Sequence, residues 1–526
     1  MAFHEILLKA RFAKGVSQET MAAAVGVSRQ AIQKWESGAA LPATENLVAL
    51  AAYLDLSLDY LLCGKDNREP EQMRLERSVQ PAFDKWHVWE AYYRNLETEY
   101  RQTVEEGKDI AAYKAVFDAV SAMPDGKDKA DMADILYRVV ENAPMRADFP
   151  YDEPSDLAGI RAGSALTFGI RHAEKDEAFA EKVRGAWYGR ICGCLLGKPV
   201  EGMRRGDLKA FLARTDNLPM HRYIVKSEAA PLADAFTFPI ARRAYDDGVL
   251  AAMPADDDTN YIVIAHKAVE TFGRDFTSAQ MAQVWVDSQS KNAYCTAERA
   301  AYRNFVNGYL PPESARCKNP YREWIGAQIR GDYFGWINPG DPLTASEMAF
   351  RDACMSHVAN GIYGEMWVAA SLAIVGAGVS PKEAIREGLA YIPRASRLHE
   401  ALMKVHEAYE SGQSAEDFFA DFHKRWNDAI PHHWCHTISN AEIVTAAVLW
   451  GGEDYGRAVC LAVEQGFDTD CNGATVGSLM GFALGKQGVG RQWTEKISGK
   501  LDTTVFGFGR VDVDAMAAKT LSHLPA

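Results

Sequence analysis

GAWYGRICGCLLG at residues 185–197 and GATVGSLMGFALG at residues 473–485 each carry a glycine at every fourth position. That spacing puts each row of glycines along one face of a helix. A glycine in the middle of a helix costs about 1 kcal/mol relative to alanine, so eight of them need a compensating reason. We predict that the two helices pack closely against each other or pass through the centre of a domain. The alternative is that each row meets bulky side chains.

Two short acidic elements stand beside these helices. DTD at residues 468–470 comes directly before the second glycine row, and DDDT at residues 256–259 opens the periodic segment 261–272. Acidic residues at a helix start usually cap free N–H groups. Three consecutive aspartates exceed that need, because they repel one another and a bound cation relieves the repulsion. If the fold brings the two elements together, we expect two hard divalent cations and a metallohydrolase.

Length and composition bound the class of protein. At 526 residues the chain is long enough for two to four domains, and 48% hydrophobic with 24% charged residues is typical of a soluble globular protein. No apolar run approaches the ~18 residues that span a bilayer, so we expect a cytoplasmic protein with no membrane contact. Helical periodicity dominates, which predicts an all-α fold divided into residues 1–66, 67–145 and 146–526.

The N-terminal part reads as a helix, a glycine turn and a second helix. Ser17 is placed to cap the first helix, Gly26 to end it, and Ser28 to cap the second, residues 29–35. The stretch 17–38 resembles the lambda-repressor/Cro-like helix-turn-helix family. The resemblance implies that the second helix enters a DNA major groove. The expected DNA contacts are Gln18, Ser28, Arg29, Gln30, Gln33 and Lys34.

Charge leaves alternatives open for this module. Residues 1–66 hold six Lys and Arg against seven Asp and Glu, and the whole chain has a net charge of −14, so any DNA contact must be local. The alternatives to DNA binding are that these polar residues are only the solvated face of a small bundle, or that the module binds a protein partner. Pairing of two copies on a two-fold operator is the usual way to gain affinity, and we therefore consider a homodimer.

Residues 67–80 are polar and read as an exposed hinge. A helical stretch is predicted to follow, with one aromatic face formed by Trp86, Trp89, Tyr93, Leu96 and Tyr100. This face packs either on the C-terminal domain or on a second copy of the chain.

From about residue 151 to the end, the chain resembles the ADP-ribosylglycohydrolase family. The resemblance is carried by residues 185–202 (GAWYGRICGCLLGKPVEG), the aspartate run, Ser356-His357 in a predicted helical stretch, and residues 466–477 (GFDTDCNGATVG). It implies an all-helical fold with a two-magnesium centre and hydrolysis of an ADP-ribosyl or related ribosyl bond.

The family's site residues carry over by motif. The metal carboxylates would be Asp257, Asp258, Asp468 and Asp470. Thr259 stands beside them, Glu201 matches a substrate-side glutamate, and His357 matches a position near bound ADP-ribose. The alternative for His357 is a packed core residue.

Departures from the family pattern concern the metals. Asp256 stands where the family has Thr or Ser and adds a carboxylate, and Cys471 stands where a hydroxyl residue often completes the second site. We include both in the candidate metal set. Because a thiol is a poor ligand for Mg²⁺, this site would be weakened, rebuilt with water, or suited to Mn²⁺.

Mechanistically, two cations would activate a water that attacks the anomeric carbon, with Asp258 or Glu201 handling the proton. The competing hypothesis is a transcription regulator whose hydrolase-like domain senses ADP-ribose or another nucleotide-like glycoside without turnover. A rival metal signal is the cluster His432, His433, Cys435 and His436, in which two histidines have the spacing of a zinc helix.

Overall fold

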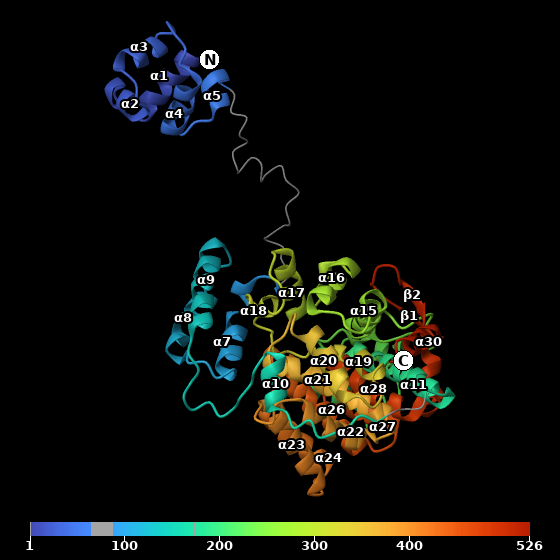
Figure 1. The fold of residues 1–526 in the computed structure, drawn as a ribbon. Coiled ribbons are helices and arrows are strands. Elements are labelled where there is room, and N and C mark those ends of the chain that lie inside the picture. The colour runs from blue at the N-terminus through green and yellow to red at the C-terminus, as the bar shows by residue number, and fades with distance from the viewer. Residues whose placement is uncertain (1, 65–87, 172–174, 526) are drawn as a thin grey trace. The chain divides into compact units, whose positions relative to one another are not determined.

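The computed structural model describes residues 2–64, 88–171 and 175–525, and the chain divides into two compact units, within residues 1–86 and 87–526 (Figure 1). The described residues are mostly helical and contain one two-stranded sheet, which confirms the predicted all-α class. The predicted hinge 67–80 and Trp86 lie outside the described residues.

The first unit is a bundle of short helices around a small apolar core that includes Met21, Ile32 and Leu50. Its helices are α1 (Phe3–Ala13), α2 (Gln18–Val25), α3 (Arg29–Glu36), α4 (Thr44–Leu54) and α5 (Leu58–Cys63). The Ser17 hydroxyl accepts from the Thr20 amide at 3.0 Å, and that of Ser28 accepts from the Ala31 amide at 3.2 Å. Gly26 ends α2 with φ +74°. The predicted helix, turn and helix are confirmed.

The second unit begins with a connector. It comprises a 3₁₀ turn η2 (Tyr92–Arg94) and the helices α7 (Leu96–Glu105), α8 (Lys114–Ser121) and α9 (Lys127–Asn142), with the turn η3 (Ala111–Tyr113) before α8. The continuous aromatic helix predicted through residue 100 is therefore wrong in its first part. The Asn95 side chain donates to the carbonyls of Val88 at 2.5 Å and Ala91 at 3.1 Å, and such local bonds compete with helix formation.

The aromatic face has two destinations. Leu96 joins Phe117 in a core that belongs to the connector itself, with Tyr93 and Tyr100 packed against it. Trp89 packs against the C-terminal helices, with the Arg299 guanidinium 5.1 Å from its ring centroid. The part of the face that the structure describes thus packs within one chain.

The remaining helices surround a large apolar core. They are α10 (Leu157–Gly163), α11 (Glu177–Gly197), η4 (Lys198–Val200), α12 (Arg205–Arg214), α13 (Lys226–Ala229), η5 (Ala230–Leu232), α14 (Ile240–Arg243), α15 (Asp257–Phe272), α16 (Ser278–Ser288), η6 (Lys291–Ala293), α17 (Thr296–Val306), α18 (Glu313–Arg316), η7 (Gln328–Arg330), α19 (Asp332–Trp336), α20 (Pro342–Ala353), α21 (Ala359–Gly376), α22 (Pro381–Glu387), η8 (Gly388–Tyr391), α23 (Arg397–Glu410), α24 (Ala415–Arg425), α25 (Pro431–Cys435), α26 (Thr437–Gly451), α27 (Tyr455–Val463), α28 (Thr469–Val489), α29 (Arg491–Thr494), η9 (Glu495–Ile497) and α30 (Val513–Ser522). Strands β1 (Lys500–Asp502) and β2 (Arg510–Asp512) pair antiparallel, with Leu501 opposite Val511.

Helices α11 and α28 pack glycine row against glycine row. A Cβ atom on Gly189 would lie 2.1 Å from the carbonyl oxygen of Gly477, and one on Gly193 would lie 1.9 Å from that of Gly473. The backbones are therefore in direct contact, and this contact is the compensating reason for the glycines. The prediction that the two helices pack against each other is confirmed.

Two local predictions are wrong. Gly485, the last glycine of the second row, is not helical but sits at a kink with φ +72°. Ser356 and His357 lie in the turn between α20 and α21, not within a helix. The turn forms because Ser356 and His357 close the end of α20 through amides that donate to the Ala353 carbonyl.

A single methyl group tests the glycine contact. We expect Gly189→Ala to lower the free energy of unfolding by more than about 3 kcal/mol, because its Cβ has no space beside the Gly477 carbonyl. Gly206→Ala is the matched control: Gly206 is also in a helix and has nothing within 4 Å of its Cβ position. The control should be neutral or stabilising by about 1 kcal/mol in denaturant unfolding. Equal effects of the two substitutions would contradict the packing argument.

Candidate metal centre

The two acidic elements meet where α15 and α28 begin. One ligand atom each from Asp258, Asp470 and Cys471 lies within 4.8 Å of the others, and the same holds for Cys194, Asp256 and Asp258. Asp258 belongs to both groups. The helix contact sets this arrangement, because Gly197 at the end of α11 lies against the backbone of Thr469 and Asp470.

Asp258 forms a buried ion pair with Arg190 of α11. Arg190 Nη2 lies 3.1 Å from Asp258 Oδ1, and Arg190 Nη1 lies 2.9 Å from Asp332 Oδ2. All three side chains are buried. The second oxygen of Asp258, Oδ2, is buried and has no hydrogen-bond partner among the described residues. An orphaned carboxylate oxygen in an acidic cluster is a suitable ligand for a hard cation.

Three of the candidate metal carboxylates lack a basic partner among the described residues. In the part of the chain that the structure describes, neither Asp257 nor Asp468 nor Asp470 forms an ion pair with Lys or Arg. Burial, and then the charge of Glu201, raise the pKa of Asp468 to about 7 and that of Asp470 well above its ordinary value. Asp257 is the half-buried member of the set. Oxygen ligands whose charge is not neutralised by the protein fit a divalent cation.

Asp256 differs from its neighbours because both of its oxygens are engaged. Oδ1 accepts from the Asp258 amide at 3.0 Å and caps α15, and Oδ2 forms an ion pair with Lys198. Burial raises the pKa of Asp256, but Lys198 outweighs it and the net shift is downward. A cation would have to displace Lys198 to use Asp256. Sequence reasoning missed Lys198, although it directly follows the first glycine row.

The cysteines of the centre are neutral thiols. Burial, and then the charges of Asp258, Asp468 and Asp470, raise the pKa of Cys471 well above its usual value. The Cys435 thiol lies 3.6 Å from Asp468 Oδ2 and donates to it. Cys471 is thus placed with the metal carboxylates, but as a protonated thiol, which does not bind Mg²⁺.

Glu201 and Thr259 lie at different depths. The Glu201 carboxylate is 38% exposed and pairs with Arg243, whose Nη2 lies 2.8 Å from Oε2. Thr259 is buried, and its hydroxyl donates to the Asp256 carbonyl at 3.1 Å. Glu201 is therefore at the open side of the centre, whereas the Thr259 hydroxyl is used inside the first turn of α15. Arg243 was not identified from sequence because a lone arginine carries no motif.

His357 lies in a separate buried network. Its Nδ1 is 2.8 Å from Ser356 Oγ, and its Nε2 is 3.9 Å from Glu298. Arg330 connects the same network, since it binds Glu298 at 2.8 Å and Ser356 at 3.1 Å. Burial and Arg330 lower the pKa of His357 well below its usual range. This position agrees with the packed-core alternative.

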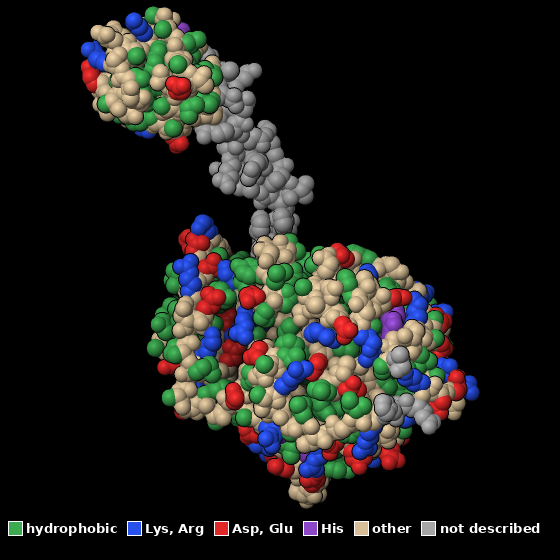
Figure 2. Space-filling view, viewed as in Figure 1, with side chains coloured by type: hydrophobic (Ala, Val, Ile, Leu, Met, Phe, Trp, Pro, Cys, Tyr) green, Lys and Arg blue, Asp and Glu red, His purple; other side chains and the backbone are tan. Residues whose placement is uncertain are grey.

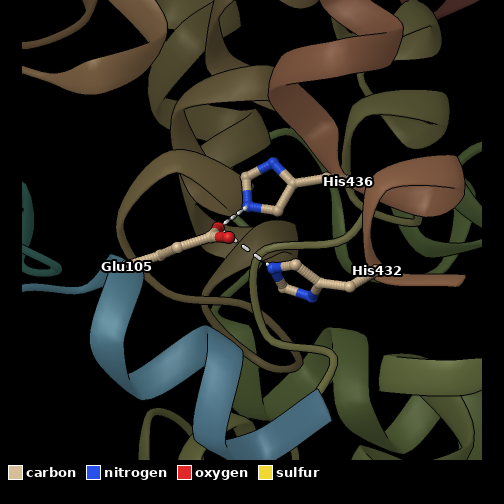
Figure 3. A group of neighbouring side chains, drawn as sticks. All are labelled: Glu105, His432 and His436. Carbon is tan, nitrogen blue, oxygen red and sulfur yellow. Dashed lines mark hydrogen bonds and ion pairs between the residues drawn. The ribbon is translucent and has the colours of Figure 1, made fainter. Parts of the chain in front are cut away.

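The histidine cluster makes polar contacts that disfavour zinc. His432 Nδ1 accepts from Trp324 Nε1 at 3.0 Å, and His436 Nδ1 accepts from the Ile438 amide at 3.1 Å. A ring nitrogen that accepts a hydrogen bond carries no proton, so the proton of each ring is on Nε2; the two Nε2 atoms lie 3.0 and 3.7 Å from Glu105 Oε2 (Figure 3). A nitrogen that carries a proton offers no lone pair to a metal.

The candidate DNA-contacting residues share one surface of the first unit. Ser28, Arg29, Gln30, Gln33 and Lys34 are exposed at or on α3. Arg29 pairs with Glu19 of α2 at 2.9 Å, and Gln18 is half-buried and donates to Glu36 at 2.8 Å. The visible face of this unit carries few basic side chains (Figure 2), in line with its balanced charge.

The fold and the site define a helical domain of the glycohydrolase class, joined to a helix-turn-helix module. The chain belongs to the ADP-ribosylglycohydrolase family, since the profile of that family, described as ADP-ribosylglycohydrolase, matches residues 175–524. A helix-turn-helix profile matches residues 7–61. Both resemblances read from the sequence are confirmed.

Curated relatives match the N-terminal part. The HTH-type transcriptional activator BcrR of Enterococcus faecalis is 39% identical over 66 residues, which are 12% of this chain and 32% of that protein. The transcriptional repressor RstR of the cryptic phage CTXphi of Vibrio cholerae is 37% identical over 83 residues, 15% of this chain and 73% of that protein. The chain spans only about a third of the first of these relatives.

A solved structure described as an ADP-ribosylglycohydrolase-related protein complex has a TM-score of 0.43 and 19% identity, covering 66% of this chain and 98% of that chain.

Among the described residues, no helix combines the length and apolar character needed to cross a bilayer.

The buried carboxylates predict a pH-dependent stability without metal. A carboxyl whose pKa is raised to about 7 on folding, as for Asp468, binds its proton more tightly in the folded state. Its stabilisation is present at low pH and is lost as pH rises through about 7. In chelator, the free energy of unfolding should fall between about pH 4 and about pH 7, and Mg²⁺ should restore it at the higher pH.

Substitution identifies the source of this slope. Asp468→Asn should flatten the pH dependence measured by denaturant unfolding in chelator, because it removes the titrating carboxyl. Asp246→Asn is the control, since Asp246 is exposed and pairs with Lys226 at 2.8 Å. A slope that persists in Asp468→Asn and disappears in Asp246→Asn would refute the assignment.

Proposed function

We propose that the C-terminal unit is a magnesium-dependent hydrolase that cleaves the glycosidic bond of an ADP-ribosyl or related ribosyl substrate. The observation that carries the proposal is the position of Asp258, which belongs to both groups of candidate ligands. Its Oδ2 atom is buried without a hydrogen-bond partner among the described residues, and it lies in a cluster that also contains Asp470, which has no basic partner there. Family membership supports the reaction class. Mn²⁺ is the second candidate ion.

Each residue of the centre has a part in this proposal. Asp257, Asp258, Asp468 and Asp470 would hold the cations. Arg190 fixes Asp258, because its Nη2 donates to the Asp258 carbonyl at 2.9 Å and lies 3.1 Å from Oδ1. Two cations bound there would acidify a water and orient the ribose hydroxyls. The buried thiols surround the carboxylates without adding charge.

Glu201 is better placed than Asp258 to handle the proton. Asp258 is fully buried and tied to Arg190, whereas Glu201 is partly exposed at the open side. Arg243 Nη2 holds Glu201 Oε2 at 2.8 Å and so orients this carboxylate, which suits the role of a base toward water. Besides burial, the charge of Glu201 contributes to the raised pKa of both Asp257 and Asp468.

Product release tests the enzyme proposal. We would incubate the protein with ADP-ribosylated proteins, ADP-ribose derivatives and simple ribosides, with Mg²⁺, Mn²⁺ or chelator, and detect products by mass spectrometry. Asp257→Asn should reduce turnover by more than about 100-fold, since a lost metal ligand weakens both metal binding and water activation. Asp246→Asn is the control for charge. Metal-independent turnover, or full activity in Asp257→Asn, would overturn the proposal.

We also propose that the N-terminal module binds DNA through α3 in a sequence-specific manner. The module's fold and its relatives support this role. In a gel shift with the region upstream of the gene, Arg29→Ala plus Lys34→Ala should weaken binding at least about 10-fold, through lost base or phosphate contacts. Lys9→Ala plus Lys14→Ala on and after α1 removes the same charge and should weaken binding less. An unchanged shift in the α3 double variant would refute the recognition-helix assignment.

The competing proposal is a regulator that senses a nucleotide-like glycoside without hydrolysing it. Two observations favour it: Lys198 occupies one oxygen of Asp256, and Cys471 supplies a protonated thiol in place of an oxygen ligand. A sensor would bind ADP-ribose and change DNA affinity without forming product, which the same mass-spectrometric assay distinguishes from turnover.

A further inference from the structure

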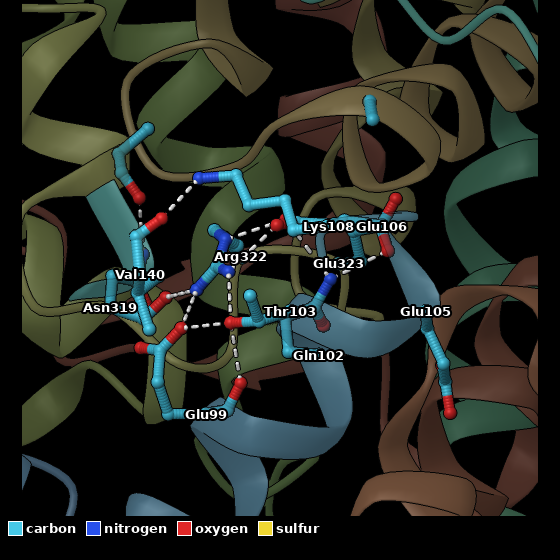
Figure 4. A network of polar contacts seen from close by, with 12 residues as sticks. Glu99, Gln102, Thr103, Glu105, Glu106, Lys108, Val140, Asn319, Arg322 and Glu323 are labelled. Atoms are coloured by element: carbon cyan, nitrogen blue, oxygen red, sulfur yellow. Dashed lines mark hydrogen bonds and ion pairs between the residues drawn. The ribbon is translucent and has the colours of Figure 1, made fainter. Parts of the chain in front are cut away.

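The connector docks on the C-terminal helices through polar groups. Arg322 is buried beneath α7, where its Nη1 lies 2.8 Å from Glu99 Oε1 and its Nε lies 2.6 Å from Glu106 Oε1 (Figure 4). Gln102 donates to Glu323 Oε2 at 2.6 Å. Buried charges bound by several partners tolerate little displacement, because each lost contact leaves a charge unpaired. The network therefore fixes one register of α7.

The last residue of α7 reaches the single helical turn α25 and His436, which precede α26. Glu105 Oε2 lies 3.0 Å from His432 Nε2 and 3.7 Å from His436 Nε2, so one carboxylate serves two rings (Figure 3). His436 Nε2 also lies 3.8 Å from Glu323 Oε2. Both histidines are buried. Glu105 thus accepts a hydrogen bond from His432, whereas His436 Nε2 lies near Glu105 and Glu323 without a hydrogen-bond partner among the described residues.

The same turn carries a side chain of the metal centre. Cys435, immediately before His436, donates its thiol to Asp468 Oδ2 at 3.6 Å. The turn is pinned to the neighbouring loop, since the Ile325 amide donates to the Cys435 carbonyl at 2.8 Å and the Thr437 amide to the Glu323 carbonyl at 3.0 Å. A shift of the histidines would therefore move the Cys435 thiol.

We propose that Glu105 of the connector is a positioning residue for the metal centre: through His432 and His436 it fixes the turn that holds the Cys435 thiol against Asp468. The inference rests on the proposed metal-dependent function. Coupling between two sites is reciprocal, so a cation bound at Asp468 stabilises the docked α7 by the factor by which α7 strengthens cation binding. In the sequence the connector follows the DNA-binding module, and occupancy of the metal centre is thereby communicated to the segment next to that module.

The test compares two glutamates of the same helix in the full-length protein. Mn²⁺ affinity, measured by electron paramagnetic resonance, should fall about 10-fold in Glu105→Ala, the size typical when an outer partner of a metal ligand is lost. Glu97→Ala is the matched control, because Glu97 is also on α7 but is exposed and forms an ion pair with Arg101 at 3.2 Å. Cys435→Ala should weaken Mn²⁺ binding similarly, and Cys435→Ser, which keeps a donor, should restore it.

A metal-independent measurement separates this inference from the proposed function. In chelator, hydrogen exchange of peptides covering residues 432–440 and 466–472 should accelerate in Glu105→Ala but not in Glu97→Ala. Unchanged exchange and unchanged Mn²⁺ affinity in a folded Glu105→Ala protein would overturn the positioning role. If the unaltered protein binds no Mn²⁺ while Glu105→Ala still accelerates exchange at residues 466–472, the metal-dependent function fails and the positioning of Asp468 stands.

Discussion

The direct backbone contact between α11 and α28 is the constraint on which the site depends. Their glycine rows allow a separation that any side chain would prevent, and the contact continues to Gly197 at the end of α11. It brings the start of α28, with Asp470, against the end of α11, whose Arg190 and Lys198 pair with Asp258 and Asp256 of the other acidic element. A looser helix pair would separate Asp470 from Asp258, with which it shares the candidate metal cluster.

The positions of the basic residues then determine which carboxylates are neutralised by the protein and which are left to bind a cation. Arg190 serves Asp258 and Asp332 together, and Lys198 serves Asp256 alone. The protein supplies no basic partner, among its described side chains, for Asp257, Asp468 or Asp470. Burying these groups without a counter-charge is costly, which is why burial moves the pKa of each upward. A divalent cation removes that cost more effectively than a proton, because it neutralises two carboxylates at once.

Local rules predicted much of this arrangement from sequence. The four-residue glycine spacing led to the helix pair, and Ser17 and Ser28 marked two helix starts, because each signal depends on residues close in the chain. The ion pair of Lys198 with Asp256 joins positions 58 residues apart, and no spacing rule identifies such a partner. Asn95 interrupted the predicted aromatic helix because its side chain competes for backbone carbonyls. His357 looked exposed to ligand in the motif, yet its partners Glu298 and Arg330 come from other elements.

The interface under α7 follows a different physical rule from the core. Apolar packing stabilises strongly but tolerates small shifts, whereas a buried arginine bound to two glutamates adds little net stability and fixes geometry. Arg322 sets the register of α7, and that register determines where Glu105 meets His432 and His436. A change at Asp468 that moves His432 or His436 would disturb their contacts with Glu105, and α7 tolerates little displacement because each lost contact leaves a buried charge unpaired. The connector is therefore suited to respond to the centre rather than only to support it.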